Sequence, residues 1–184
     1  MNERIILSTK KLDLTIKRLC YQLIENHNDF SNSVILGLQP RGALFASRVH
    51  QNLCKITGND QISFGTLDTT FHRDDFRRRD VPLIPNSTQV NFIIEDKKVV
   101  LIDDVLYTGR TIRAGLDAML AFGRPDLVEL LVLIDRRYSR DLPIQPNYTG
   151  QVVDTISSER VNVEWEEIHK EDKVVLYTPD STIK

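Results

Sequence analysis

The sequence predicts an α/β protein with a mainly parallel, twisted sheet flanked by helices. Short unbroken apolar runs occupy residues 33–38, 99–102 and 127–134. Such runs are typical of strands buried on both faces of a parallel sheet. The first two runs lead into a loop with small residues and then into apolar residues at helical spacing, which is the order of a βα unit. We therefore expect a sheet with helices packed on its faces.

The composition is that of an ordinary globular chain. Its 184 residues suit a single domain, which we assign to residues 1–184. Hydrophobic residues make up 41% and the formal charge is −2, which argues against a globally basic nucleic-acid binder. No apolar run approaches the ~20 residues that span a bilayer, and no signal-like segment follows Met1. We expect a cytoplasmic protein with no membrane partner and with Cys20 and Cys54 as buried free thiols.

The first 67 residues alternate helical and strand patterns. Ser8 is a candidate cap for a helix that ends near His27, with apolar residues at helical spacing between them. Four basic residues lie off that apolar stripe, and we interpret them as a solvated face, with an RNA contact as the alternative: Lys10, Lys11, Lys17 and Arg18. The strand at 33–38 runs through Gln39-Pro40-Arg41-Gly42 into a second helix, and residues 62–67 form the next strand.

Residues 68–90 form a charge-dense segment that we expect to be a flexible loop. A mobile charged loop can close over a reacting phosphate ester and exclude water. Arg73 is the candidate for meeting the anionic ligand in the closed state, while Asp74 and Asp75 are candidates for holding the loop or lying near a metal. Residues 90–94 are expected to pair as the second strand of a hairpin that leads back to the sheet.

The βα alternation stops after residue 134. Short or alternating apolar runs at 152–153, 161–165 and 174–177 predict antiparallel strands. We assign approximately residues 140–184 to a small hood over the strand ends. The sequence shows no internal repeat and no second core.

The segment that follows the run at 99–102 combines two acids with an anion-binding loop. Thr108, Gly109 and Thr111 offer backbone N–H groups and hydroxyls, and the helix start adds unpaired donors with a partial positive charge. Asp103 and Asp104 would repel a bare phosphate. A phosphorylated ribose with bound Mg²⁺ removes the conflict, because carboxylates accept hydrogen bonds from hydroxyls and bind the cation. The alternative is an acidic pair that merely caps a βα turn.

The string of apolar strand, two acids, spacers and Thr108-Gly109-Arg110-Thr111 resembles the phosphoribosyl-pyrophosphate (PRPP) signature of the type I phosphoribosyltransferases. Further blocks, in order along nearly the whole chain, are similar to the PyrR family of pyrimidine-operon regulators: Leu67-Asp68, Arg73-Asp74-Asp75, Gly123-Arg124-Pro125, Ile134-Asp135-Arg136, Leu142-Pro143-Ile144 and Ser158-Glu159-Arg160-Val161. The resemblance implies the type I phosphoribosyltransferase fold. It also implies a Mg²⁺-dependent uracil phosphoribosyltransferase that makes UMP and pyrophosphate, binds pyrimidine leader mRNA to control attenuation, and forms homodimers or tetramers.

The resemblance also implies roles for individual residues. Asp103 and Asp104 would hold the ribose hydroxyls directly or through Mg²⁺, and with Arg73 they form the expected catalytic set. The expected PRPP- and nucleotide-binding residues are Pro40, Arg41, Asp103, Asp104, Val105, Leu106, Tyr107, Thr108, Gly109, Arg110 and Thr111. Arg136 and Val161 are expected to frame the base.

Two segments depart from the family pattern. Pro40 stands where the family has threonine, which removes a hydroxyl and fixes φ. The family's Asp-Arg-Gly-His segment is replaced by Asp135-Arg136-Arg137-Tyr138-Ser139, with one extra residue.

Two alternatives for the function stay open, namely a phosphoribosyltransferase for another base and an RNA-binding nucleotide sensor with little catalysis. The second would draw on Lys10, Lys11, Lys17, Arg18, Arg137 and Arg140.

Overall fold

A five-stranded parallel sheet forms the centre of the protein. The computed structural model describes residues 3–74 and 86–179. The strand order is β3-β2-β4-β5-β6, and every neighbouring pair is parallel. The strands are β2 (Ser33–Leu38), β3 (Ser63–Leu67), β4 (Lys98–Leu106), β5 (Leu127–Arg137) and β6 (Tyr148–Asp154). The predicted α/β fold with a mainly parallel sheet is confirmed.

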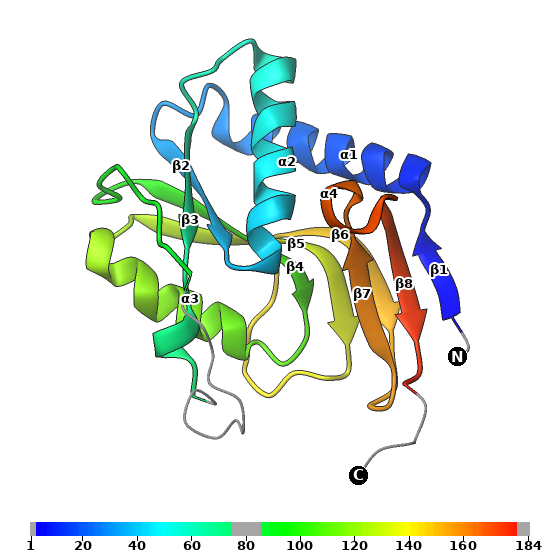
Figure 1. The fold of residues 1–184 in the computed structure, drawn as a ribbon. Coiled ribbons are helices and arrows are strands. Elements are labelled where there is room, and N and C mark those ends of the chain that lie inside the picture. The colour runs from blue at the N-terminus through cyan, green and yellow to red at the C-terminus, as the bar shows by residue number, and fades with distance from the viewer. Residues whose placement is uncertain (1–2, 75–85, 180–184) are drawn as a thin grey trace.

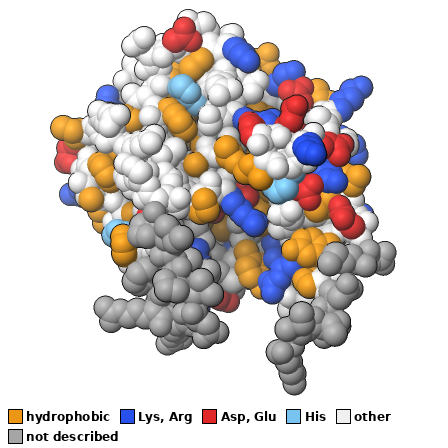
Figure 2. All heavy atoms as spheres, viewed as in Figure 1, with side chains coloured by type: hydrophobic (Ala, Val, Ile, Leu, Met, Phe, Trp, Pro, Cys, Tyr) orange, Lys and Arg blue, Asp and Glu red, His pale blue; other side chains and the backbone are white. Residues whose placement is uncertain are grey.

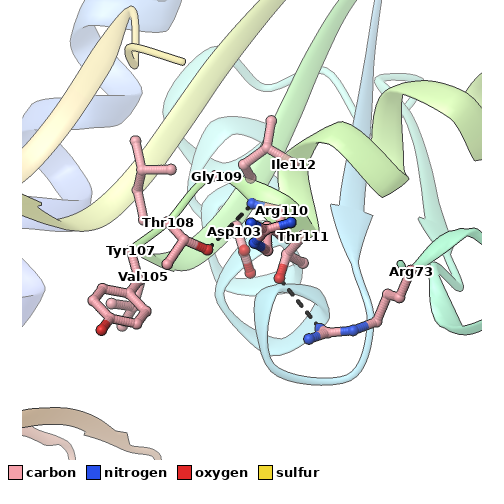
Figure 3. Close-up of a pocket in the computed structure, with 10 residues that line it drawn as sticks. Arg73, Asp103, Val105, Tyr107, Thr108, Gly109, Arg110, Thr111 and Ile112 are labelled. Atoms are coloured by element: carbon pink, nitrogen blue, oxygen red, sulfur yellow. Dashed lines mark hydrogen bonds between the residues drawn. The ribbon is translucent and has the colours of Figure 1, made fainter. Parts of the chain in front are cut away.

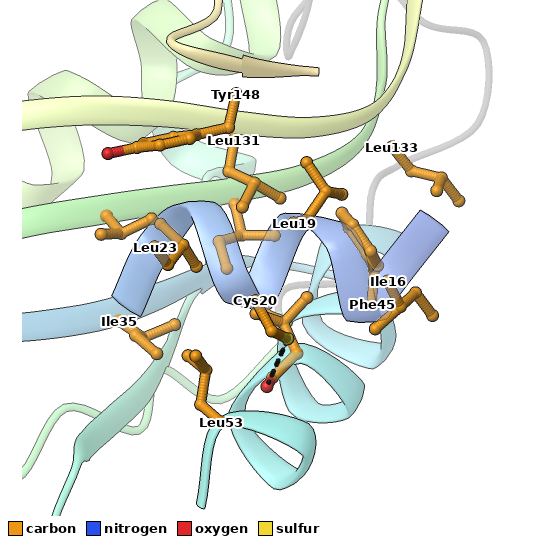
Figure 4. Packing of buried hydrophobic residues seen from close by; sticks show 14 of the residues in the cluster. Ile16, Leu19, Cys20, Leu23, Ile35, Phe45, Leu53, Leu131, Leu133 and Tyr148 are labelled. Atoms are coloured by element: carbon orange, nitrogen blue, oxygen red, sulfur yellow. Dashed lines mark hydrogen bonds between the residues drawn. The ribbon is translucent and has the colours of Figure 1, made fainter. Parts of the chain in front are cut away.

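Helices cover both faces of this sheet (Figure 1). On one face lie α1 (Thr9–His27) and α2 (Arg41–Thr57). On the other lie α3 (Arg110–Met119) and the 3₁₀ turn η2 (Leu120–Phe122). Apolar residues of β2, β4 and β5 alternate between two buried clusters, one under each layer. Figure 4 shows the first cluster, where Leu19 and Leu23 of α1 lie between the sheet and Leu53 of α2.

A smaller antiparallel sheet lies beside the carboxyl ends of the large one. Its order is β1-β8-β7, formed by β1 (Glu3–Leu7), β8 (Lys173–Tyr177) and β7 (Arg160–Glu164). The short helix α4 (Glu166–His169) joins β7 to β8. Arg48 of α2 donates hydrogen bonds of 2.5–3.2 Å to Asp172 and Glu167, and this network holds the small sheet against α2.

Two strand predictions were wrong, and one strand was missed. Residues 152–153 lie in β6, parallel to β5, and not in an antiparallel strand. Residues 90–94 form no strand, and only Gln89 makes an isolated antiparallel bridge, to Thr66. The N-terminal strand β1 was not predicted, because residues 3–7 are few and do not alternate between polar and apolar. It completes the small sheet by pairing with β8 at the other end of the sequence.

The two thiols differ in exposure. Cys20 is fully buried in the cluster under α1, and its Sγ lies 3.6 Å from the carbonyl of Val49. Cys54 is partly exposed, so the prediction that both thiols are buried was wrong for that residue. Over residues 3–74 and 86–179 the structure has no helix that is long and apolar enough to cross a membrane.

Candidate active site

The carboxyl ends of the parallel strands open onto a polar cleft, which is where α/β sheets bind ligands. Two adjoining hollows make up this cleft, one of about 550 Å³ and one of about 300 Å³. Five residues line both hollows: Arg73, Asp103, Val105, Tyr107 and Thr111. Figure 2 shows lysine and arginine side chains at this end of the molecule, between the two grey segments. The cleft therefore suits an anionic ligand.

The smaller hollow is built on the loop between β4 and α3. Gly109 is the N-cap of α3 and has φ +89°, a left-handed conformation that glycine adopts without strain. A Cβ there would lie 3.2 Å from Ile144, so the residue is packed from behind as well. Thr108, Gly109, Arg110 and Thr111 surround the hollow (Figure 3). The backbone N–H groups at the start of α3 can accept an anion such as a phosphate.

The acidic pair lies inside β4, which continues through it to Leu106. The prediction placed the pair beyond the strand, whereas Asp103 and Asp104 are only 7% and 5% exposed. Burial raises the pKa of Asp103 well above its usual range, and the neighbouring Asp104 carboxylate raises it further. Burial also raises the pKa of Asp104, against the lowering effect of Arg41. Burial thus disfavours the doubly charged pair, so the two carboxylates need a cation or hydroxyl donors beside them to be ionised together.

The donor set fits Mg²⁺ shared with a ligand. Asp104 Oδ2 is buried and has no hydrogen-bond partner among the described residues, so it can still accept a ligand. Within the same residues no group of three or more His, Cys, Asp or Glu side chains could hold a metal alone. Mg²⁺ is commonly bound by one or two carboxylates together with substrate phosphates and water. Asp103 and Asp104 match that arrangement.

The start of α2 brings a cationic side chain to the same cleft. Pro40 is the N-cap and Arg41 the first residue of α2, and both line the larger hollow. The Gln39–Pro40 peptide bond is cis. Gly42 follows, and a Cβ there would lie 2.7 Å from Asp103 Oδ1 and 2.9 Å from its Cα. Only glycine allows α2 to begin this close to the acidic pair.

The segment after β3 reaches across the cleft to the start of α3. Arg73 follows the 3₁₀ turn η1 (Thr70–His72), and its Nη1 donates a hydrogen bond of 3.3 Å to Thr111 Oγ1 (Figure 3). Asp74 forms an ion pair with Arg110. These contacts place Arg73 and Asp74 beside the loop at residues 108–111. Asp75, the other predicted loop residue, lies outside the described residues.

The predicted base pocket forms the far wall of the larger hollow. Arg136, Val161 and Tyr107 all line it. Arg136 is only 3% exposed, and its side chain donates hydrogen bonds to Thr155 Oγ1 and to the carbonyl of Glu159. Its guanidinium is thus paired with protein groups, and it also lies over the ring of Tyr107, which forms part of the same wall.

Sequence reasoning missed several lining residues: Gln39, Thr69, Thr70, Asn86 and Arg160. Thr69 and Thr70 follow the carboxyl end of β3, so the rule that singled out the acidic pair could have found them. Gln39 directly follows the carboxyl end of β2, so the same rule could have found it. Arg140 was a candidate for an RNA contact. Its guanidinium instead donates hydrogen bonds to backbone carbonyls of the protein.

Comparison with known proteins defines the class. A family model described as "Phosphoribosyl transferase domain" matches residues 4–168. A hypoxanthine phosphoribosyltransferase from Staphylococcus aureus superposes with a TM-score of 0.70 at 18% identity, covering 98% of this chain and 94% of that one. The enzyme of that name from Trypanosoma cruzi gives 0.70 at 15% identity, with 96% and 97% covered. Fold and family model together make the chain a phosphoribosyltransferase.

Sequence relatives narrow the class to one family. "Bifunctional protein PyrR" of Desulfosudis oleivorans is 42% identical over 174 residues, which covers 95% of this chain and 96% of the relative. The protein of that name from Bacillus subtilis is 37% identical over 181 residues, with 96% and 98% covered. The chain belongs to the PyrR family, and the resemblance inferred from its motifs is confirmed.

Proposed function

We propose that this protein transfers the phosphoribosyl group of PRPP to uracil, giving UMP and pyrophosphate, and also regulates pyrimidine genes by binding their leader RNA. One observation carries the enzymatic part. The buried carboxylates of Asp103 and Asp104 and the phosphate loop at residues 108–111 line one cleft at the carboxyl edge of the sheet. The names of the relatives support the regulatory part.

The two ends of PRPP would occupy different parts of the cleft. The 5′-phosphate would bind at the start of α3, where Thr108, Gly109 and Thr111 supply N–H groups and hydroxyls. The pyrophosphate would lie toward Arg41 and Arg73. The ribose would rest between these sites, over Asp103 and Asp104.

The chemistry is displacement at the anomeric carbon. The bond to the pyrophosphate oxygen breaks, the bond to the base nitrogen forms, and the base nitrogen loses a proton. Asp103 and Asp104 stabilise the positive charge that builds on the ribose, while Arg41 and Arg73 stabilise the leaving group. Preorganised charge of this kind is usually the largest catalytic term. The raised pKa of Asp103 also makes its carboxylate a better acceptor for the base proton.

Asp103 and Asp104 would hold Mg²⁺ together with PRPP, and the unpaired Asp104 Oδ2 fits that role. The ion, when bound, supplies positive charge to the ribose hydroxyls and the pyrophosphate.

The test is an assay of purified protein with PRPP, Mg²⁺ and a panel of bases. We expect turnover of uracil and little turnover of hypoxanthine or orotate. Asp104→Asn should lower kcat by about 10²-fold, by analogy with the loss of one electrostatic contact in other active sites. Uracil turnover by this variant at the wild-type rate would refute the role of the pair, and preference for another base would refute the substrate.

The regulatory part is tested by RNA binding. Binding to a pyrimidine leader RNA should weaken steeply as the salt concentration rises, because phosphate contacts release counterions. UMP should strengthen the binding.

Several of the basic residues considered for RNA binding already have protein partners. Arg18 donates to the carbonyls of Thr149 and Gly150, and Arg137 pairs with Asp154. If RNA binding is absent or does not depend on salt, the regulatory part of the proposal is refuted and only the enzymatic part remains.

A further inference from the structure

Arg140 lies just outside the cleft, in the segment that connects β5 to β6, and its side chain is directed at the protein backbone. The side chain is 22% exposed. Its Nη2 pairs with the carboxylate of Asp135. Its Nε and Nη1 lie within 2.5–3.3 Å of four main-chain carbonyls, those of Leu106, Tyr107, Arg136 and Ile144.

These carbonyls belong to three separate pieces of backbone. Leu106 ends β4 and Tyr107 follows it, Arg136 is the penultimate residue of β5, and Ile144 belongs to the segment that leads to β6. A planar guanidinium offers five donors in a fixed fork, which suits it to join several acceptors at once. Arg140 therefore fixes the ends of two adjacent strands relative to the segment behind them.

That segment is the support of the phosphate loop. The carbonyl of Thr108 accepts hydrogen bonds from the N–H groups of Asp141, at 3.0 Å, and Leu142, at 3.2 Å. Ile144 packs behind Gly109. Asp141 also accepts a 3.0 Å hydrogen bond from Arg110 Nε. The loop is thus held from behind by the residues that directly follow Arg140.

We propose that Arg140 is a positioning residue for the phosphate site: it sets the backbone at residues 107–109 so that the N–H groups at the start of α3 converge on the 5′-phosphate. This inference rests on the proposed function, because it takes the loop to bind the phosphate of PRPP and of the nucleotide product. It also removes Arg140 from the set of surface cations. The surface cation of this segment is Arg137, whose side chain is exposed. Among the described residues it pairs with Asp154 and lies near the ring of Tyr138.

The experiment compares Arg140→Lys with Arg137→Lys in the full chain. Both changes keep the charge and lose the planar fork. We expect Arg140→Lys to raise KM for PRPP and Kd for UMP by about tenfold or more, since a misplacement of 1 Å can cost about 10²-fold. The Kd for magnesium pyrophosphate, which meets the opposite wall, should change less than about twofold. Arg137→Lys should leave all of these values within about twofold of wild type.

The contrast between the two ligands separates positioning from general loosening. Equal losses of UMP and pyrophosphate affinity in Arg140→Lys would overturn the proposal, and so would unchanged UMP binding. If that variant does not fold, Asp135→Asn takes its place, because it keeps the arginine and weakens only its anchor. It should raise the Kd for UMP by about threefold and leave that for pyrophosphate unchanged, and equal changes again count against the proposal.

Failure of the proposed function gives a different result. A wild-type protein that prefers another base refutes uracil as the substrate, and the monophosphate of that base then replaces UMP in the comparison. If no base is turned over, the comparison uses PRPP and pyrophosphate binding. Selective loss of PRPP binding in Arg140→Lys still supports the positioning role, and its absence overturns it.

Discussion

Arg136 lies against the ring of Tyr107, with 4.0 Å between the guanidinium carbon and the ring centroid. The first residue after β4 is thereby stacked on a residue near the end of β5. Burial lowers the pKa of Arg136 from its usual value. Even so, arginine keeps its charge, and a desolvated cation over an aromatic face contributes up to about 2 kcal/mol. The contact makes the wall of the larger hollow a rigid surface against which a flat base can lie.

Replacing this cation should weaken both the wall and the fold. Arg136→Met leaves the partly buried carbonyl of Glu159 without its donor, and an unpaired acceptor away from water costs about 1–3 kcal/mol. We expect a loss of unfolding free energy of that size in urea, and a KM for the base raised more than that for PRPP. Arg18→Met is the control, since Arg18 donates to carbonyls on the exposed surface. An equal loss of stability in the control would contradict the argument from burial.

Gly42 is the second position where a small change should be costly. A methyl group in Gly42→Ala would meet backbone and carboxylate atoms of the acidic strand at 2.7–2.9 Å. Because backbone must move, we expect a loss of about 1–3 kcal/mol in stability together with reduced turnover. Gly58→Ala, at the other end of α2, is the matched control. Nothing lies within 4 Å of its added methyl, although its φ of +68° still costs about 1–2 kcal/mol. Normal turnover in Gly42→Ala would contradict the close approach.

Removing one charge of the acidic pair should raise the stability of the protein, although the pair is needed for the proposed activity. The folded-state pKa of Asp103 is raised above its unfolded value, so its contribution to stability is complete below the unfolded pKa and is lost as pH rises through the folded pKa. Without Mg²⁺, Asp103→Asn should therefore unfold at a higher temperature than wild type at pH 7.5, by the equivalent of about 1 kcal/mol. The difference should shrink as pH falls toward 4. Scanning calorimetry at several pH values measures it, and a less stable variant at pH 7.5 would contradict the prediction.

The elements with long apolar signals could be predicted from the sequence. Residues 33–38 were predicted as a strand with the bounds that β2 has, because a run buried on both faces cannot be mistaken for surface. Strand β6 was misjudged because it is an edge strand, and Val152 on its outer side is 45% exposed. Its alternating exposure is that of an antiparallel strand with one wet face. Pairing partners far apart in sequence, such as β1 and β8, leave no local pattern.

In the candidate site, too, the residues near long apolar runs could be predicted and the others could not. The acidic pair, Arg41 and the loop at residues 108–111 come shortly after the apolar runs at 33–38 and 99–102, and the carboxyl-edge rule predicted that they would lie together, as they do in the cleft. Arg140 could not be assigned in this way, because nothing local distinguishes an arginine that binds four carbonyls from one that faces solvent. Only the turn at Tyr138, with φ +63°, brings its side chain back under the end of β4.

The far end of the sheet holds a buried polar cluster that should make stability depend on pH. His27 Nε2 lies 2.9 Å from Glu129 Oε2, and His27 Nδ1 lies 2.9 Å from Ser33 Oγ. Tyr148 donates to the same Glu129 carboxylate. Although the carboxylate favours a charged imidazole, burial has the larger effect and lowers the pKa of His27, with Lys98 lowering it further.

A histidine whose folded-state pKa is lowered binds a proton more readily when the chain is unfolded. Stability should therefore fall as pH drops below about 6.5, with a slope of at most about 1.4 kcal/mol per pH unit. Urea unfolding at pH 7.5 and 5.5 should show a steeper loss for wild type than for His27→Gln, which cannot take up the proton. His169→Gln, at an exposed site on α4, should keep the wild-type slope. If His27→Gln kept that slope as well, the imidazole would have to be charged in the folded state, and the contact with Glu129 would then outweigh burial.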